Sequence, residues 1–141
     1  MKKWYSLIDK VYSKGNLYES FLKVKKNRGV AGIDNITISK FGKDLQENLE
    51  NIHLELKSGN YIPSPVKRVE IPKANGKMRP LGIPTVKDRI VQQAINNIIQ
   101  PIFEPDFHPQ SYGYRPNKSC QKAVAKAQVL MVRDELPYAV D

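Results

Sequence analysis

The chain has 141 residues, one cysteine and a formal net charge of +9 at pH 7, with 40% apolar and 26% charged residues. This composition is that of a globular chain, and it excludes both an intrachain disulfide and a cysteine-based zinc site. No apolar run is long enough to span a membrane and no signal-peptide pattern is present, so we expect a cytoplasmic protein. The positive charge suits a polyanionic partner, usually nucleic acid, and equally suits a well-solvated surface without one.

The amino-terminal part of the chain has three helical patterns. Apolar residues at helical spacing predict a helix over residues 3–12, and an N-cap at Asn16 predicts a second helix that ends at Gly29. Two glycines and an Asp-Asn pair predict a loop over residues 29–36. A long helix is predicted over residues 39–57, with one apolar stripe made of Phe41, Leu45, Leu49, Ile52 and Leu56.

The next pattern is that of a β-hairpin. Residues 66–71 alternate between apolar and charged, Asn75-Gly76 predicts a tight turn, and residues 78–83 return as a second strand. Proline lacks the backbone N–H that an interior sheet position requires. Because Pro72 and Pro80 lie in these strands, the hairpin is expected to project rather than to join a large sheet.

The hairpin and the segment before it are strongly basic. Between Lys57 and Arg79 there are six basic residues, and Glu70 is the only acid; the basic residues are Lys57, Lys67, Arg68, Lys73, Lys77 and Arg79. Arginine and lysine around a projecting turn can clamp phosphates. Lysines also protect an exposed strand edge from aggregation. Taken by itself the charge pattern favours this second explanation, and only the neighbouring segments shift it towards function.

The carboxy-terminal part is predicted to contain two helices and the start of a strand. Thr85, with Asp88 at the third position, caps a helix whose buried side is made of Ile90, Val91, Ala94, Ile95 and Ile98. Turns are expected at Pro101, Pro105 and Pro109. Ser119 caps a last helix, on whose apolar face Cys120 is expected to be buried rather than to form a catalytic pair with a histidine. Residues 137–141 begin a strand.

Three long segments, in this order, resemble the group II intron-encoded reverse transcriptase family. NRGVAGIDNITISKF (27–41) is similar to its amino-terminal extension motif, YIPSPVKRVEIPKANGKMRPLGIPTVKDRIVQQAI (61–95) to its first fingers block, and IFEPDFHPQSYGYRPNKSCQKAV (102–124) to its second. The closing YAVD resembles the start of the motif with the first metal-binding aspartate. Tyr114 departs from the family, which more often has phenylalanine there. The chain contains neither the paired aspartates of the palm nor the thumb.

The resemblance implies an α+β fold. Residues 1–136 would form the amino-terminal extension and a mostly helical fingers subdomain of a right-hand polymerase, with a projecting β-hairpin. Residues 137–141 would be the first strand of a palm that is otherwise missing. The parent enzyme is implied to be an RNA-directed DNA polymerase of a mobile genetic element, which adds nucleotides to a primer 3′ end by two-metal catalysis. This truncated chain is expected to be inactive by itself.

The resemblance also assigns roles to residues of the hairpin. Lys73 and Arg79 would contact the triphosphate of the incoming dNTP. The residues that would cover the templating base or follow the template backbone are Lys67, Arg68, Ile71, Leu81, Gly82 and Ile83. Packing inside the hairpin is an equally good explanation for the apolar members of this set, namely Ile71, Leu81 and Ile83.

Two further residues are assigned from the remaining blocks. Arg115 would brace the template path or the junction of fingers and palm, unless it only forms a structural ion pair. Asp141 would be the first catalytic carboxylate and a ligand of Mg²⁺, in a site that this chain leaves incomplete.

The implied partners are an RNA template, an RNA/DNA duplex and dNTP, with intron RNA as a possible further partner and no membrane. The sequence leaves the oligomeric state open. It also leaves open an alternative function, that of a non-catalytic RNA-binding module that assists splicing, as a maturase does.

Overall fold

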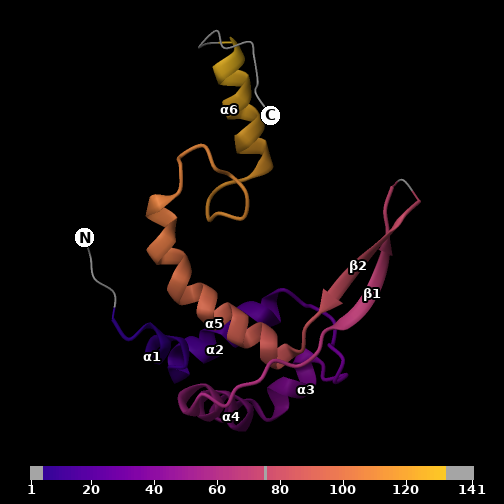
Figure 1. Cartoon of the computed structure of the whole chain (residues 1–141), viewed down its shortest axis with the longest axis vertical. Helices are drawn as coiled ribbons and strands as arrows, with labels where there is room; N and C mark the ends of the chain where they lie inside the picture. The colour runs from indigo at the N-terminus through magenta and orange to yellow at the C-terminus, as the bar shows by residue number, and fades with distance from the viewer. Residues whose placement is uncertain (1–4, 75, 133–141) are drawn as a thin grey trace. The chain divides into compact units, whose positions relative to one another are not determined.

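The computed structural model describes residues 5–74 and 76–132, and the chain divides into two compact units, residues 1–100 and 101–141. The elements are α1 (Leu7–Val11), α2 (Lys14–Lys26), α3 (Ile38–Lys43), α4 (Leu45–Ser58), β1 (Lys67–Pro72), β2 (Met78–Ile83), α5 (Val86–Phe103), a 3₁₀ turn (Glu104–Asp106) and α6 (Cys120–Val132) (Figure 1). The expected α+β composition is confirmed: the described residues are mostly helical, with one antiparallel hairpin. None of the described helices has the length and apolar character needed to cross a membrane.

The second helix begins and ends earlier than the sequence predicts. Ser13, not Asn16, caps α2, because its hydroxyl lies three residues earlier and accepts a hydrogen bond from the Asn16 amide. Asn16 is then free to use its side-chain amide elsewhere, and it donates to the carbonyl of Val11 (2.9 Å) and to that of Ala94 in α5 (3.0 Å). The helix ends at Lys26 instead of Gly29.

The predicted long helix is two helices, α3 and α4, separated at Asp44 (φ −110°, ψ 41°). The break frees the carbonyl of Phe41, which accepts a hydrogen bond from the Asn48 side chain (2.9 Å). Thr37 caps α3 by accepting from the Lys40 amide (3.1 Å), and Gly59, at a φ of 74°, ends α4 as expected. The predicted apolar stripe is correct in spite of the break, since Phe41 and Ile52 are buried and Leu45, Leu49 and Leu56 pack against them.

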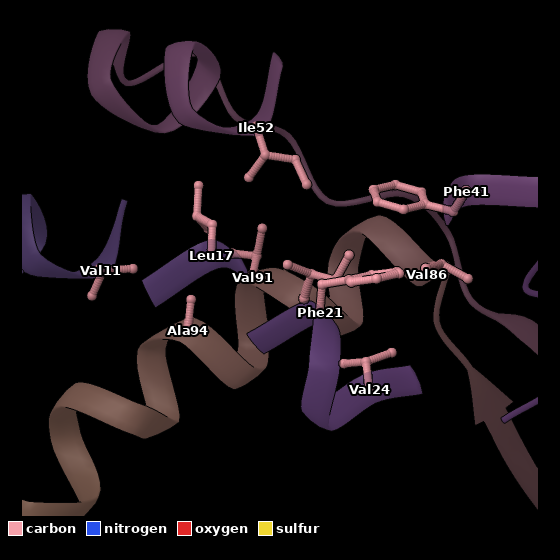
Figure 2. Close-up of a cluster of buried hydrophobic side chains, with 10 residues drawn as sticks. Val11, Leu17, Phe21, Val24, Phe41, Ile52, Val86, Val91 and Ala94 are labelled. Atoms are coloured by element: carbon pink, nitrogen blue, oxygen red, sulfur yellow. The ribbon is translucent and has the colours of Figure 1, made fainter. Parts of the chain in front are cut away.

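The core of the first unit lies between α2, the α3–α4 pair and α5. Figure 2 shows Leu17 and Phe21 of α2 facing side chains of α4 and α5. Phe21 also stacks on Phe41 of α3, with ring centroids 6.1 Å apart. Burying a side chain of this size stabilises a fold by about 1.5–3 kcal/mol. The buried apolar residues of this core are Val11, Leu17, Phe21, Val24, Phe41, Ile52, Val86, Ile90, Val91 and Ala94.

α5 starts where the sequence predicts. Its end and one residue of its predicted buried face differ from the prediction. The hydroxyl of Thr85 accepts from the Asp88 amide (3.1 Å), which confirms the predicted cap. Ile95 is 39% exposed, because it lies at the edge of the face that Ile90 and Ala94 bury. Pro101 lies inside α5 rather than ending it, since a proline near the last turn leaves only one carbonyl without its helical donor.

In the second unit, the cap at Ser119 is confirmed by a hydrogen bond from the Lys122 amide (3.2 Å). The expectation that Cys120 is buried was wrong: it is the first residue of α6, and its side chain is exposed. The reason is that no residue of α6 is buried by the described part of the chain, and Val124, Met131 and Val132 are exposed as well. The strand predicted over residues 137–141, with Asp141, lies outside the described residues.

Candidate nucleic-acid interface

The basic hairpin lies where the sequence predicts it, with β1 starting and ending one residue later than expected and β2 at the predicted bounds. Lys73 donates its amide to the carbonyl of Lys77 (2.7 Å), and Gly76 donates to the carbonyl of Lys73 (3.0 Å). Gly76 has a φ of 77°, the left-handed conformation that favours glycine, so its place in the turn is explained. Asn75 lies outside the described residues. In Figure 1 the hairpin extends away from helices α1 to α4.

The pairing of the strands divides the predicted site residues between two faces. Directly opposed residues of an antiparallel pair lie on the same face. The face with Arg79, which is opposite Ile71, consists of Lys67, Val69, Ile71, Arg79, Leu81 and Ile83. Arg68 and its partner Gly82 lie on the other face. The structure therefore brings five of the predicted residues to one surface and places Arg68 and Gly82 on the opposite one.

The apolar members of this surface differ in exposure: Val69 and Ile83 are partly buried, as packing within the hairpin would make them, whereas Ile71 and Leu81 are exposed. Ile71 is 44% and Leu81 38% exposed. Gly82 has a structural reason of its own, because a Cβ atom there would lie 2.9 Å from Cγ2 of Val66. A larger residue at position 82 would therefore have to displace the side chain of Val66, which gives glycine a packing role here that is independent of a template base.

The hairpin carries a concentrated positive charge. Residues 67–83 contain five basic residues and one acid, for a net charge of +4. Lys73 and Arg79 are exposed, as predicted. Arg68 pairs with Glu70 at 3.2 Å, and both side chains are about half or more exposed, 47% for Glu70 and 74% for Arg68. An exposed pair of this kind contributes about 0–1 kcal/mol and leaves the surrounding field positive.

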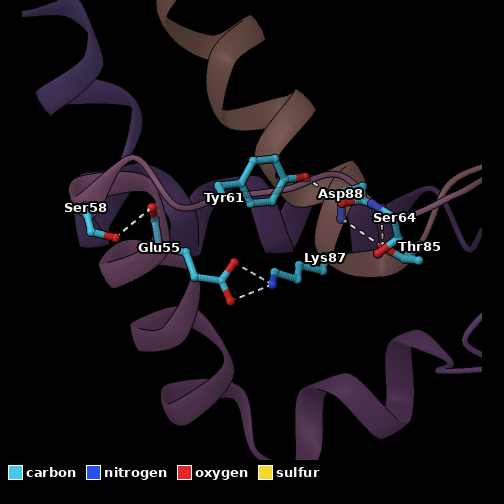
Figure 3. Close-up of polar contacts among 7 residues, drawn as sticks. All are labelled: Glu55, Ser58, Tyr61, Ser64, Thr85, Lys87 and Asp88. Atoms are coloured by element: carbon cyan, nitrogen blue, oxygen red, sulfur yellow. Dashed lines mark hydrogen bonds and ion pairs between the residues drawn. The ribbon is translucent and has the colours of Figure 1, made fainter.

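A buried carboxylate, Asp88, lies at the base of the hairpin (Figure 3). Its Oδ1 accepts from the hydroxyl of Tyr61 (2.5 Å), and its Oδ2 accepts from the hydroxyl of Thr85 (2.7 Å) and from the amide of Ser64 (3.3 Å). Asp88 is 3% exposed. Burial, followed by the hydrogen bond to Asp88, raises the pKa of the Tyr61 hydroxyl above its usual value. The sequence identified Asp88 only as a helix-capping residue.

The glycine-rich loop of residues 29–36 packs against the same region. A Cβ on Gly32 would lie 2.7 Å from the Cα of Thr85, so only glycine permits this approach of two backbones. Arg89 fixes the loop from the other side, donating to the carbonyl of Val30 (2.5 Å) and to that of Thr85 (3.3 Å).

A groove of about 720 Å³ lies between α2 and α3. Its described lining includes three cations, Lys25, Arg28 and Lys43, and no acid. Tyr18 and Leu22 contribute an apolar surface to it and are 50% and 45% exposed. Sequence reasoning missed this groove. The available signal was the high lysine content of the first helices, but the lining residues come from segments that only the fold brings together.

Arg115, in the second unit, is engaged by its own loop. Its Nε and Nη2 contact Oε1 of Glu104 at 3.0 and 2.8 Å, and its Nη1 donates to the carbonyls of His108 (2.7 Å) and Ser111 (2.9 Å). Its guanidinium also lies 5.2 Å from the ring centroid of Phe107. With a side chain 10% exposed, Arg115 organises the loop between α5 and α6, as its alternative explanation supposed. The predicted template contact stays a prediction.

Within the described residues there is no group of three or more His, Cys, Asp or Glu side chains that could hold a metal ion. Asp141, the predicted ligand, lies outside them. The assignment of Mg²⁺ therefore rests on the sequence.

Comparison with known proteins relates these features to a family. Residues 71–135, which include the last two residues of β1, all of β2 and the Arg115 loop, match the reverse transcriptase (RNA-dependent DNA polymerase) family. "Group II intron-encoded protein LtrA" of Lactococcus lactis is 40% identical over 110 residues, 76% of this chain. The chain belongs to the group II intron-encoded reverse transcriptase and maturase family.

Two other relatives match a similar share of the chain. "Protein YkfC" of Escherichia coli is 46% identical over 99 residues, 70% of the chain, and the "Putative COX1/OXI3 intron 2 protein" of Saccharomyces cerevisiae is 32% identical over 118 residues, 78% of the chain. The chain spans 26% of the length of the first of these, 12% of the second and 18% of the Lactococcus protein.

Proposed function

We propose that this chain is the fingers portion of an RNA-directed DNA polymerase and that its hairpin holds the triphosphate of an incoming dNTP over an RNA template. The observation that carries the proposal is the exposed, cationic end of the hairpin, where Lys73 begins the turn and Arg79 lies opposite Ile71. Family membership of residues 71–135 supports a reverse transcriptase function in general. The contact with dNTP and template is our extension of it.

The chemistry of the hairpin suits this role. Arginine presents a planar fork of donors and lysine a mobile point charge, and both stabilise negative charge on phosphate oxygens. Arg79 shares its face with the half-exposed Ile71 and Leu81. An apolar surface beside a cation can pack against a base while the cation holds the phosphates. Lys67 lies on this face, whereas Arg68 on the other face would reach a template backbone only from the far side.

We further propose that Asp141 ligates Mg²⁺ together with carboxylates from outside this chain. The metal, when bound, would activate the primer hydroxyl and stabilise the leaving pyrophosphate. The fingers residues described above would orient the triphosphate and exclude water from it. In this proposal the chain supplies binding and one ligand, and catalysis requires the rest of the polymerase.

The test is primer extension by a polymerase that contains this chain. Lys73→Ala and Arg79→Ala should raise the KM for dNTP or lower kcat by roughly 10-fold or more, the effect of losing a charge-assisted hydrogen bond. Asp141→Asn should lower the rate about a thousandfold or more while RNA binding persists. Lys57→Ala, a basic residue at the end of α4, is the matched control and should leave dNTP kinetics unchanged. Unaltered kinetics in both hairpin variants would remove the hairpin from the nucleotide site.

A second candidate function is RNA binding without catalysis, as a splicing-assisting module. The observation that favours it is the groove between α2 and α3, with its three cations and the exposed ring of Tyr18. Single-stranded RNA is bound by cations along its backbone and by aromatic rings on which bases stack. This surface is separate from the hairpin in the sequence and uses a different set of side chains.

Salt dependence distinguishes the two surfaces. Each phosphate of a single strand that a protein cation neutralises adds about −0.7 to the slope of log affinity against log salt. The double variant Lys25→Ala with Arg28→Ala should reduce the magnitude of this slope for RNA and leave dNTP kinetics unchanged. The hairpin variants should leave the slope unchanged and alter dNTP kinetics. Binding of RNA that does not depend on salt would contradict both uses of the basic surfaces.

A further inference from the structure

Both ends of the hairpin are attached to the helical unit at Asp88. The segment that enters β1 is held through Tyr61 and Ser64, at 2.5 and 3.3 Å from the Asp88 carboxylate. The segment that leaves β2 is held through Thr85, whose hydroxyl donates to the same carboxylate at 2.7 Å. Figure 3 shows these three groups converging on one side chain of α5.

These contacts exceed what a helix cap requires. A capping pair needs only the exchange between Thr85 and the Asp88 backbone amide. The additional donors, Tyr61 and Ser64, lie 27 and 24 residues away in the sequence. Burying a carboxylate is unfavourable unless donors compensate it, so the two extra donors hold the entering segment firmly at this point.

Neighbouring contacts fix the same point from two other directions. Lys87 forms an ion pair with Glu55 of α4 at 2.6 Å and lies 5.8 Å from the ring centroid of Tyr61. On the other side, the backbone of Gly32 packs on that of Thr85. The base of the hairpin therefore lies at a part of α5 that is itself paired with α4 and packed against the glycine-rich loop.

We propose that Asp88 is a positioning residue: by holding both ends of the hairpin on α5, it sets where Lys73 and Arg79 stand. The inference rests on the proposed function of those two cations. A strand of six residues is about 20 Å long, so a tilt of about 5° at the base moves the tip by nearly 2 Å. A displacement of about 1 Å can lower the rate of a reaction that depends on positioning by roughly 100-fold.

The direct test measures the direction of the hairpin in the full chain. Spin labels are placed at Ala74→Cys in the turn and Glu47→Cys in α4, in a Cys120→Ser background, and the distance distribution is recorded. We expect one narrow distance distribution in the labelled chain without further substitution, a broad distribution in Asp88→Ala and an intermediate one in Tyr61→Phe. Ile90→Ala is the control, because Ile90 is buried in the core on the same helix and its apolar side chain accepts no hydrogen bond from the hairpin segments; its distribution should remain narrow.

A narrow, unshifted distribution in Asp88→Ala would overturn the inference. If Asp88→Ala does not fold, Tyr61→Phe decides, since it removes one hydroxyl and keeps the ring; an unchanged distance in that variant would likewise overturn it.

The kinetic test uses a polymerase that contains the chain. Tyr61→Phe and Asp88→Ala should raise the KM for dNTP by about tenfold or more, and the Ile90→Ala control should not. If the labels report a displaced hairpin while Lys73→Ala and Arg79→Ala leave KM unchanged, the proposed function fails and the positioning role of Asp88 stands. If those cation variants raise KM and the Asp88 and Tyr61 variants do not, the positioning role fails and the proposed function stands.

Discussion

The helical part of the first unit and its hairpin differ in how each is held together. The helices share a buried core, and their polar residues bond across elements, as where Asn97 donates to Asn16 (2.9 Å) and to Ser20 (3.0 Å). The hairpin pairs with itself, exposes its cations and is attached at its base. Stability thus resides in the buried core of the helices, and the exposed cations of the hairpin contribute little to it, so the core and these cations can be changed separately.

The sharpest test of this separation is a cavity in the core. Leu17 is fully buried, and Leu17→Ala should lower the free energy of unfolding by about 2–5 kcal/mol. In the hairpin, Lys73→Ala should change it by less than about 0.5 kcal/mol, because the side chain is exposed. Urea denaturation measures both. A large loss of stability in Lys73→Ala would show that the turn is structural and would break the comparison.

Arg115 extends the comparison to the second unit, because this cation stabilises its own loop. Arg115→Ala should destabilise the loop of residues 104–118 by about 1.5–3 kcal/mol, since it removes hydrogen bonds to Glu104 and two carbonyls. Hydrogen exchange of the loop amides is the measurement, and Lys126→Ala in α6 removes the same charge as a control. Unchanged exchange, combined with a less negative salt slope for RNA binding, would instead support the predicted template contact.

The smallest expected effect concerns pH at the base of the hairpin. The folded state raises the pKa of Tyr61 above the value of about 10 that it has when unfolded. The contribution of Tyr61 to stability is therefore complete below pH 10 and is lost as the pH rises above it, because the unfolded state ionises first. Denaturation at several pH values between 8 and 11 should show a steeper loss in the wild-type chain than in Tyr61→Phe. Parallel curves would mean that the hydroxyl is not held by Asp88 in solution.

What the sequence predicted correctly is mainly local. The cap at Thr85, the helix end at Gly59 and the stripe from Phe41 to Leu56 depend on residues within a few turns of one another, and all three are confirmed. The prediction of a cap at Asn16 was wrong because Ser13, three residues earlier, also has a side-chain oxygen that can cap the helix. Cys120 was misplaced because an apolar helix face predicts burial only when another element covers it, and the described chain supplies none.

The residues that build the candidate site required the fold. The contacts of Asp88 join positions up to 27 residues apart, and those of Asn16 reach across 81 residues to Asn97, so no local pattern reveals them. The charge of the hairpin could be counted in advance. Its division between two faces could not, because the pairing register decides which residues share a surface.

The two prolines of the hairpin have a consequence for how copies of this protein behave in concentrated solution. Lys73 bonds to Lys77, and pairs along an antiparallel ladder alternate, so Pro72–Met78 and Glu70–Pro80 are pairs whose backbone amide positions point outwards. Proline has no hydrogen at that position, and one outward donor is therefore missing from each side of the ribbon. A strand from a neighbouring copy would meet an interrupted row of donors beside five positive charges. The hairpin can stand out into solvent as a bare two-stranded ribbon without seeding the growth of intermolecular sheets.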